Sequence, residues 1–324
     1  MRLVYYGTPE HAVPPLRRLA SDGHAPLLVV TRRDKPKGRG LSLSPSPVRA
    51  AATSLGIPVV TPERASAAEE VERVRALSPD LLVVVAYGQI LSPALLAVPR
   101  LGALNVHFSL LPRHRGAAPV QAALLAGDEE TGVSTMWMTE GLDEGPVFLE
   151  RATPIAPDEN AETLGARLAE MGAALLAESL DRSARGDVAR REQDHARATY
   201  APKLKTADAQ LFLADDSSAL ARRIRAYTPA PGAWLDLESE RLVVLSATSD
   251  GAPALTDAAL TAVPPVGAIL SVDRARGIGV ACGHGTLWLE RVRPAGRKEM
   301  SGADYANGAR LKPGSLLPLR DGTA

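Results

Sequence analysis

The chain has 324 residues, of which 45% are hydrophobic and 23% charged, and its 37 basic residues balance its 37 acidic residues. This composition is ordinary for a soluble globular protein of about two domains, and the charge balance favours no class of partner. A single cysteine, Cys282, excludes an internal disulfide framework, no His/Cys spacing predicts a metal site, and no apolar run approaches the ~20 residues that span a bilayer. Because a strand pattern begins at the first residues, we expect no leader segment and a cytoplasmic protein without membrane association.

Short apolar runs alternate with helical patterns over the first two thirds of the chain. The predicted strands are 2–7, 26–31, 58–60, 81–88, 103–107 and 133–138. The predicted helices are 10–22, 45–55, 66–78, 117–126 and about 160–186. Strands that alternate with helices, several of them continuously apolar, indicate a mostly parallel sheet covered on both faces. We therefore predict a doubly wound, Rossmann-like α/β domain over 1–189, with ligands bound beyond the carboxyl ends of its strands.

The remainder of the chain has a different pattern. Residues 190–207 are polar, carry little apolar periodicity and are predicted to be a linker. A helix at 219–227 is followed by short segments that Gly, Pro, Asp and Ser separate, at 242–246, 267–272, 277–281 and 286–293. This spacing predicts a smaller C-terminal β-barrel domain of the OB type over 208–324.

The predicted strand 103–107 ends in polar side chains. Because side chains alternate along a strand, Asn105 and His107 share one face and Val106 lies on the other. A lone histidine is more often a buried side chain satisfied by its neighbours than a functional one. An amide donor on the same face, followed by a polar loop, favours a functional site.

A second loop follows the predicted strand 133–138. Gly141 and Gly145 bracket Asp143 there, which indicates a tight turn. An isolated turn aspartate is common. If this loop meets the end of the strand that carries His107, however, the carboxylate, imidazole and amide form a general acid–base set. We expect the resulting crevice to be built wholly from strand-end loops before residue 150.

Seven motifs occur in a fixed order along the chain. They are GTPE (7–10), GRGLSLSPSPV (38–48), VVVAYGQILS (83–92), NVHFSLLPRHRGAAP (105–119), GDEETGVSTMWM (127–138), GLDEGP (141–146) and RPAGRKEM (293–300). This pattern resembles the methionyl-tRNA formyltransferase family across nearly the whole chain. The resemblance implies transfer of the formyl group of 10-formyltetrahydrofolate, as co-substrate, to initiator Met-tRNA for translation initiation.

The resemblance also implies roles for individual residues. The catalytic residues would be Asn105, His107 and Asp143. The folate-binding residues would be Ser109, Leu110, Leu111, Pro112, Tyr87, Gln89, Ile90 and Leu91. The tRNA-binding residues would be Lys35, Lys37, Arg39, Arg297 and Lys298. We expect a monomer that needs neither a metal ion nor a covalent intermediate.

The implied chemistry fits these side chains. The methionine amine attacks the formyl carbon, and negative charge develops on oxygen in a tetrahedral intermediate. Asn105 and a charged His107 are suited to that oxygen, while Asp143 can hold His107 charged and help to remove the amine proton. Ser109 is more suited to contacting folate than to acting as a nucleophile, because no activating base spacing surrounds it. His114, where relatives commonly carry an aromatic residue, is interpreted as a flanking loop residue.

The basic stretch 32–39 has two interpretations. A charge run is usually a solvated loop. Glycines at 38 and 40 and prolines at 36, 45 and 47 oppose regular structure, so the stretch is also suited to contacting phosphates as a flexible cationic loop.

Other functions remain open. A formyltransferase that acts on glycinamide ribonucleotide or an amino sugar would use the same Asn, His and Asp, but would not need a cationic loop and a C-terminal barrel. A hydrolase would release formate from formyltetrahydrofolate without an acceptor. A catalytically inactive RNA-binding protein is disfavoured by the intact catalytic residues, and a dinucleotide site by the absence of GxGxxG after the first strand.

Overall fold

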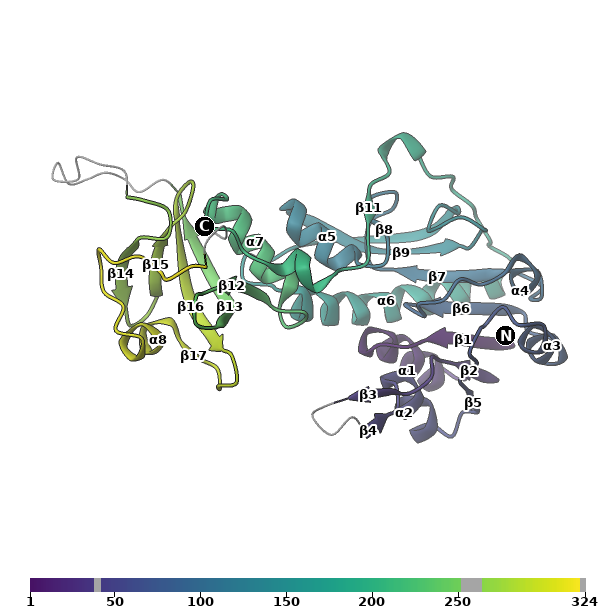
Figure 1. The fold of residues 1–324 in the computed structure, drawn as a ribbon. Helices are drawn as coiled ribbons and strands as arrows, with labels where there is room; N and C mark the ends of the chain where they lie inside the picture. The colour runs from purple at the N-terminus through teal and green to yellow at the C-terminus, as the bar shows by residue number, and fades with distance from the viewer. Residues whose placement is uncertain (38–41, 252–263, 321–324) are drawn as a thin grey trace. The chain divides into compact units, whose positions relative to one another are not determined.

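The computed structural model describes residues 1–37, 42–251 and 264–320, and Figure 1 shows them as a ribbon. They form two compact units. The first comprises Met1–Val120, Glu129–Ala156 and Thr163–Lys203, and the second comprises Gln121–Asp128, Pro157–Glu162 and the chain from Leu204 onward. None of the helices in the described ranges is long and apolar enough to cross a membrane.

The first unit is built on a seven-stranded sheet with the order β10-β9-β7-β6-β1-β2-β5. Its strands are β1 (Leu3–Gly7), β2 (Leu28–Val30), β5 (Val59–Val60), β6 (Leu81–Val85), β7 (Ala103–His107), β9 (Glu130–Trp137) and β10 (Val147–Pro154). The five strands from β7 to β5 are parallel, whereas β9 is antiparallel to β7 and β10 is antiparallel to β9. The predicted mostly parallel sheet is confirmed. Strand β10 was not predicted, because its second half is largely exposed and carries no continuous apolar run.

Helices cover both faces of this sheet. They are α1 (Val13–Ser21), α2 (Pro47–Ser54), α3 (Ala68–Ala76), α4 (Pro93–Leu96) and α6 (Ala161–Ala184), with a short 3₁₀ turn, Glu10–Ala12, before α1. Most of helix α5 (Pro119–Ala126) is assigned to the second unit. On one face, Val4 and Tyr6 of β1 share a buried cluster with Val71 of α3 and Leu95 of α4. All five residues of β6 are buried, as expected for a central strand between two helical layers.

The segment after β2 departs from the prediction. Strand β3 (Lys35–Lys37) pairs antiparallel with β4 (Ser42–Ser44), so this stretch contains a regular element despite Pro36. A proline is tolerated in a two-stranded ribbon because its missing N–H can lie on the unpaired side. Helix α2 then begins as the sequence predicts, with Pro47 in its first turn and the Ser46 hydroxyl accepting from the Arg49 N–H at 3.0 Å.

The second unit is an antiparallel sheet with the order β12-β13-β16-β15-β14, with β17 beside β16. Its strands are β12 (Ala233–Asp236), β13 (Arg241–Asp250), β14 (Ile269–Asp273), β15 (Gly277–Ala281), β16 (Thr286–Pro294) and β17 (Met300–Ser301). Helices α7 (Ser217–Tyr227) and α8 (Gly302–Gly308) complete it, together with the 3₁₀ turn Thr206–Ala209. Strand β12 was not predicted, because it is short and follows directly on the TPAPG turn.

The two edge strands of this sheet are joined by the end of the chain. Leu319 forms a bridge with Leu237, just beyond β12, and Leu316 forms one with Ala268, just before β14. The Leu317 N–H also donates to the Gly267 carbonyl at 2.9 Å. The C-terminal segment therefore closes the sheet, in agreement with the predicted barrel.

Candidate active site

Strand β7 presents its polar side chains on one face only. Asn105 and His107 are 8% and 5% exposed, respectively. On the opposite face, Gly172 of α6 lies against Val106 and Phe108, where an added Cβ would be 3.0 Å and 3.3 Å from their side chains. The predicted division of side chains between the two faces is confirmed, and Phe108 packs away from the Asn105–His107 pair.

The loop that carries Asp143 reaches this face by a route that the sequence did not predict. Strand β9 is antiparallel to β7, with Asn105 opposite Met136, so the loop after β9 starts beside the beginning of β7. It folds back over the sheet, and Asp143 Oδ1 accepts from Asn105 Nδ2 at 3.2 Å. The Asp143 loop therefore meets β7 as expected, but it contacts Asn105 within the strand as well as His107 at its carboxyl end.

The Asp143 loop has a constrained backbone. Asp143 has φ of +51°, in the left-handed region that non-glycine residues seldom adopt. A Cβ on Gly145 would lie 1.9 Å from the Trp137 carbonyl oxygen, so only glycine fits this close approach. On its other carboxylate oxygen, Asp143 accepts from the Gly116 N–H at 2.8 Å. Because surrounding groups must hold such a conformation, a functional role for this turn is favoured over that of an ordinary turn aspartate.

His107 is oriented by a main-chain acceptor. Its Nε2 lies 2.9 Å from the His114 carbonyl oxygen. Because a carbonyl can only accept, Nε2 carries a hydrogen, and Nδ1 is the ring nitrogen that can exchange a proton. Nδ1 lies 3.7 Å from Asp143 Oδ2, close enough for an ion pair but too far for a direct hydrogen bond.

His114 lies in the turn between β7 and β8 (Arg115–Gly116), as expected of a flanking loop residue, but its main chain also supports the site. It is 6% exposed and has φ of +57°. Its N–H donates to Thr199 Oγ1 at 2.8 Å, while its carbonyl holds His107. Sequence reasoning could not find this role, because it belongs to the backbone and depends on a turn conformation that a histidine does not usually adopt.

The SLLP turn after β7 is packed into the protein. Ser109 is fully buried and its hydroxyl donates to the Arg113 carbonyl at 2.6 Å, within its own turn. Leu111 is buried in a small cluster with Met136 and Val147. Leu110 and Pro112 are half-buried. The Ser109 and Leu111 side chains therefore serve the local fold, so contacts of these two residues with a ligand would come mainly from main-chain atoms.

The segment after β6 divides its side chains in the same way. Tyr87 and Leu91 are 2% and 4% exposed and belong to the core, and burial raises the pKa of Tyr87 to about 12. The Gln89 amide accepts from the Ala65 N–H at 2.9 Å and donates to the Glu63 carbonyl at 3.2 Å. Ile90 is 85% exposed. Only Ile90 thus presents a free side chain, which favours recognition through the backbone of this loop.

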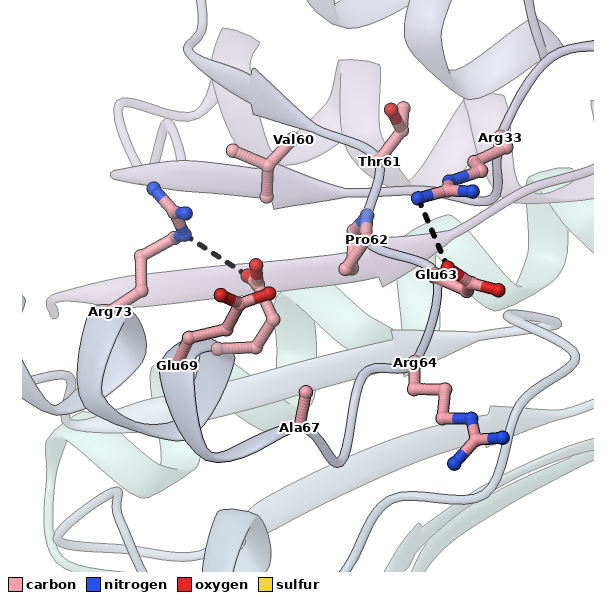
Figure 2. A pocket seen from close by; sticks show the side chains of 10 residues that line it. Arg33, Val60, Thr61, Pro62, Glu63, Arg64, Ala67, Glu69 and Arg73 are labelled. Atoms are coloured by element: carbon pink, nitrogen blue, oxygen red, sulfur yellow. Dashed lines mark hydrogen bonds and ion pairs between the residues drawn. The ribbon is translucent and has the colours of Figure 1, made fainter.

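A pocket of about 640 Å³ adjoins the loop that Gln89 holds (Figure 2). Its lining consists of Arg33, Val60, Thr61, Pro62, Glu63, Arg64, Ala67, Glu69, Glu70 and Arg73. Arg33 pairs with Glu63 and Arg73 with Glu70, and the three arginines are matched by three glutamates. None of the three predicted catalytic residues lines it. The pocket is therefore separate from the Asn105–His107–Asp143 site, and its balanced charge selects strongly for neither anions nor cations.

The predicted tRNA-binding residues lie in two places. Lys35 and Lys37 are in β3, while Arg39 lies outside the described residues. In the second unit, Arg297 and Lys298 are exposed in the turn after β16. Across the described parts of the chain, neither has an ion-pair partner, whereas nearby Arg291 pairs with Glu299. Two unpaired cations in an exposed turn remain available for phosphate oxygens.

Sequence reasoning missed a group of residues that support the site from the predicted linker. Arg191 pairs with Val147 through main-chain bonds of 2.8 Å and 2.9 Å. Gln193 is buried beside Asp143, and β11 (Tyr200–Ala201) pairs with β8 (Arg115–Gly116). We expected the crevice to be built wholly from loops before residue 150. That expectation was wrong, because residues 191–201 contribute to it. The polar composition of 190–207 concealed this, because its buried contacts are hydrogen bonds and leave no apolar periodicity.

Comparison with known proteins places this geometry in a family. Residues 1–180 match the formyl transferase model and residues 203–310 match the model of the formyl transferase C-terminal domain. The methionyl-tRNA formyltransferase of Halorhodospira halophila is 49% identical over 97% of this chain and 98% of its own length. That of Citrifermentans bemidjiense is 44% identical over 99% of this chain and 98% of its own length.

A solved structure shares the fold at much lower identity. HypX from Aquifex aeolicus in complex with tetrahydrofolic acid superposes with a TM-score of 0.63 at 16% identity, covering 97% of this chain and 48% of HypX. Because the curated relatives match at more than 40% identity over nearly their whole length, they define the relationship more closely than the fold does. The chain therefore belongs to the methionyl-tRNA formyltransferase family.

Proposed function

We propose that the chain transfers the formyl group of 10-formyltetrahydrofolate to the α-amino group of methionine on initiator Met-tRNA, with Asn105, His107 and Asp143 as its catalytic residues. The observation that carries this assignment is the contact of Asp143 with both Asn105 and the His107 ring, at 3.2 Å and 3.7 Å, over one face of β7. Full-length similarity to enzymes of that name supports the acceptor.

The site supplies donors for the oxygen of the tetrahedral intermediate. The Asn105 amide has two hydrogens, and only one is used in the contact with Asp143. The second can reach the developing oxyanion. When protonated, His107 Nδ1 is a further donor, because its Nε2 is already occupied by the His114 carbonyl. Preorganised donors of this kind are each typically worth ~10²–10³ in rate.

Asp143 is suited to proton transfer from the attacking amine. One carboxylate oxygen accepts from Asn105 and the other from the Gly116 N–H, at 3.2 Å and 2.8 Å. Each oxygen has a second lone pair, which can accept the proton directly or through a water molecule. The 13% exposure of the Asp143 side chain leaves it accessible from the site.

Contacts with tRNA are assigned to basic residues of both units. Arg297 and Lys298 in the second unit, with Lys35, Lys37 and Arg39 in the first, are proposed to bind backbone phosphates. Two sites of positive charge on a chain with no net charge are expected to produce local attraction for a polyanion rather than general adhesion to it.

The deciding experiment is a transfer assay with labelled 10-formyltetrahydrofolate. We expect label to appear on Met-tRNA, with no transfer to glycinamide ribonucleotide offered as a competing acceptor. Preferred transfer to glycinamide ribonucleotide would contradict the proposed acceptor. Formate release at the same rate without any acceptor would indicate a hydrolase instead.

A further inference from the structure

Gln193 is a buried amide beside the Asp143 loop, with 6% of its surface exposed. Its Nε2 donates to the main-chain carbonyls of Asp143 and Gly145, at 3.0 Å and 2.7 Å. Its Oε1 accepts from Nε and Nη2 of Arg115, at 3.0 Å and 2.7 Å. Both donors and both lone pairs of the amide are therefore used. Reversing the amide would place its NH₂ group against the guanidinium, so this network fixes its orientation.

Arg115, which donates to Gln193 from the side opposite the Asp143 loop, is 1% exposed. Besides Gln193, its guanidinium contacts His195 Nδ1 at 3.3 Å. No carboxylate in the described ranges lies within ion-pair distance of it. A buried cation with only neutral partners is costly, and an apolar side chain would serve packing better. The arrangement is explained if the guanidinium is there to hold Gln193 in one position.

The main chain around Arg115 holds the same loop from a second side. The Arg115 N–H donates to the Thr199 carbonyl at 2.8 Å. The next N–H, of Gly116, donates to the carboxylate of Asp143 at 2.8 Å. The loop is thus held at its side chain by Gly116 and at two of its carbonyls by Gln193.

We propose that Gln193 is a positioning residue for formyl transfer, which acts by keeping Asp143 in its left-handed conformation and in reach of Asn105 and His107. This inference rests on the proposed catalytic role of Asp143. A residue at φ of +51° relaxes unless its surroundings over-determine it, and the two carbonyl contacts lie on the loop that has this conformation.

The substitution Gln193→Glu separates the contact of Gln193 with Arg115 from its contacts with the Asp143 loop. A carboxylate still accepts from Arg115, and gives it a counter-charge, but it cannot donate to the Asp143 and Gly145 carbonyls. We expect a folded protein by circular dichroism, a fall in kcat of roughly tenfold or more, and little change in KM for 10-formyltetrahydrofolate. Gln193→Leu removes the contacts with Arg115 and with the Asp143 loop, and provides the second test. The matched control is Glu192→Gln, which exchanges a carboxylate for an amide at the neighbouring, exposed residue. It is expected to have the activity of the unmodified enzyme.

A double substitution tests whether Gln193 acts through Asp143. In an Asp143→Asn background, Gln193→Glu should cause no further loss, because the two changes affect one unit. Fully active Gln193→Glu and Gln193→Leu proteins would overturn the inference, as would losses that multiply in the double variant. A fully active Asp143→Asn protein would instead contradict the proposed function itself, so the two failures are distinguishable.

Discussion

The Asn105 amide donates to Asp143 Oδ1 at 3.2 Å and joins β7 to a loop that lies 38 residues further along the chain. This contact has two consequences. It fixes the orientation of the Asn105 amide. The second N–H of that amide therefore also points in a fixed direction. The contact also couples the proposed oxyanion donor to the proposed proton acceptor, so that displacement of one residue disturbs the other.

The first prediction concerns the two proposed oxyanion donors. Asn105→Ala and His107→Ala should each lower kcat by ~10²–10³, because each removes one donor that is held in place before the reaction begins. Transfer of labelled formyl to Met-tRNA measures this loss, and circular dichroism establishes that the variants are folded. Near-normal turnover in either variant would show that the site lies elsewhere.

The second prediction concerns the charge of Asp143. Asp143→Asn should lower kcat by at least ~10², because the amide keeps an acceptor for one neighbour but loses the negative charge that faces His107. Glu144→Gln is the matched control, since it makes the same exchange at the next, exposed residue. Equal loss in both variants would indicate a general effect on the loop.

The extent to which this site could be predicted depends on the kind of contact. Side-chain alternation in β7 and the glycines around Asp143 are local patterns, and both led to residues that the structure brings into contact. The approach of the loop over the sheet depends on the antiparallel direction of β9, which no residue of the loop records. The contributions of His114 and Gln193 are hydrogen bonds of a carbonyl and of a buried amide. Such bonds leave no trace in apolar periodicity, the main signal in a single sequence.

The fold shows the same division. Continuous apolar runs identified the buried strands such as β6, whereas β10 and β12 were missed because they are half exposed or short. The paired strands β3 and β4 are stabilised by their pairing rather than by intrinsic preference, so Pro36 within β3 was misleading. Closure of the second unit by Leu316 and Leu319 is a long-range contact that composition does not indicate.

The third prediction separates the backbone of His114 from its side chain. Asparagine tolerates positive φ, whereas a β-branched residue does not. His114→Val should therefore lower the free energy of unfolding by about 1–3 kcal/mol more than His114→Asn, and should also lower kcat by moving the carbonyl that holds His107. Urea unfolding and the transfer assay measure the two effects. Equal stability and turnover in both variants would mean that the left-handed conformation is not important.

The fourth prediction concerns the exposed turn after β16. The double substitution Arg297→Ala with Lys298→Ala should raise KM for Met-tRNA while leaving KM for 10-formyltetrahydrofolate nearly unchanged. Arg274→Ala, another exposed arginine of the same unit, is the control and should alter neither constant. If both constants rise together, the turn supports the fold of the enzyme rather than the binding of tRNA.

The last prediction concerns the basic stretch in the first unit, where two interpretations differ in their dependence on salt. If Arg39 contacts a phosphate, Arg39→Ala should weaken tRNA binding and reduce the slope of log K against log salt concentration by roughly one, because one fewer counterion is released. A loop residue that is merely solvated would leave the slope unchanged. Arg17→Ala, an exposed arginine of α1, removes the same charge from the same unit and so corrects for the change in net charge. Only a reduced slope that is specific to Arg39→Ala supports a phosphate contact. Equal slopes for the two variants would show that this stretch is an ordinary solvated charged loop.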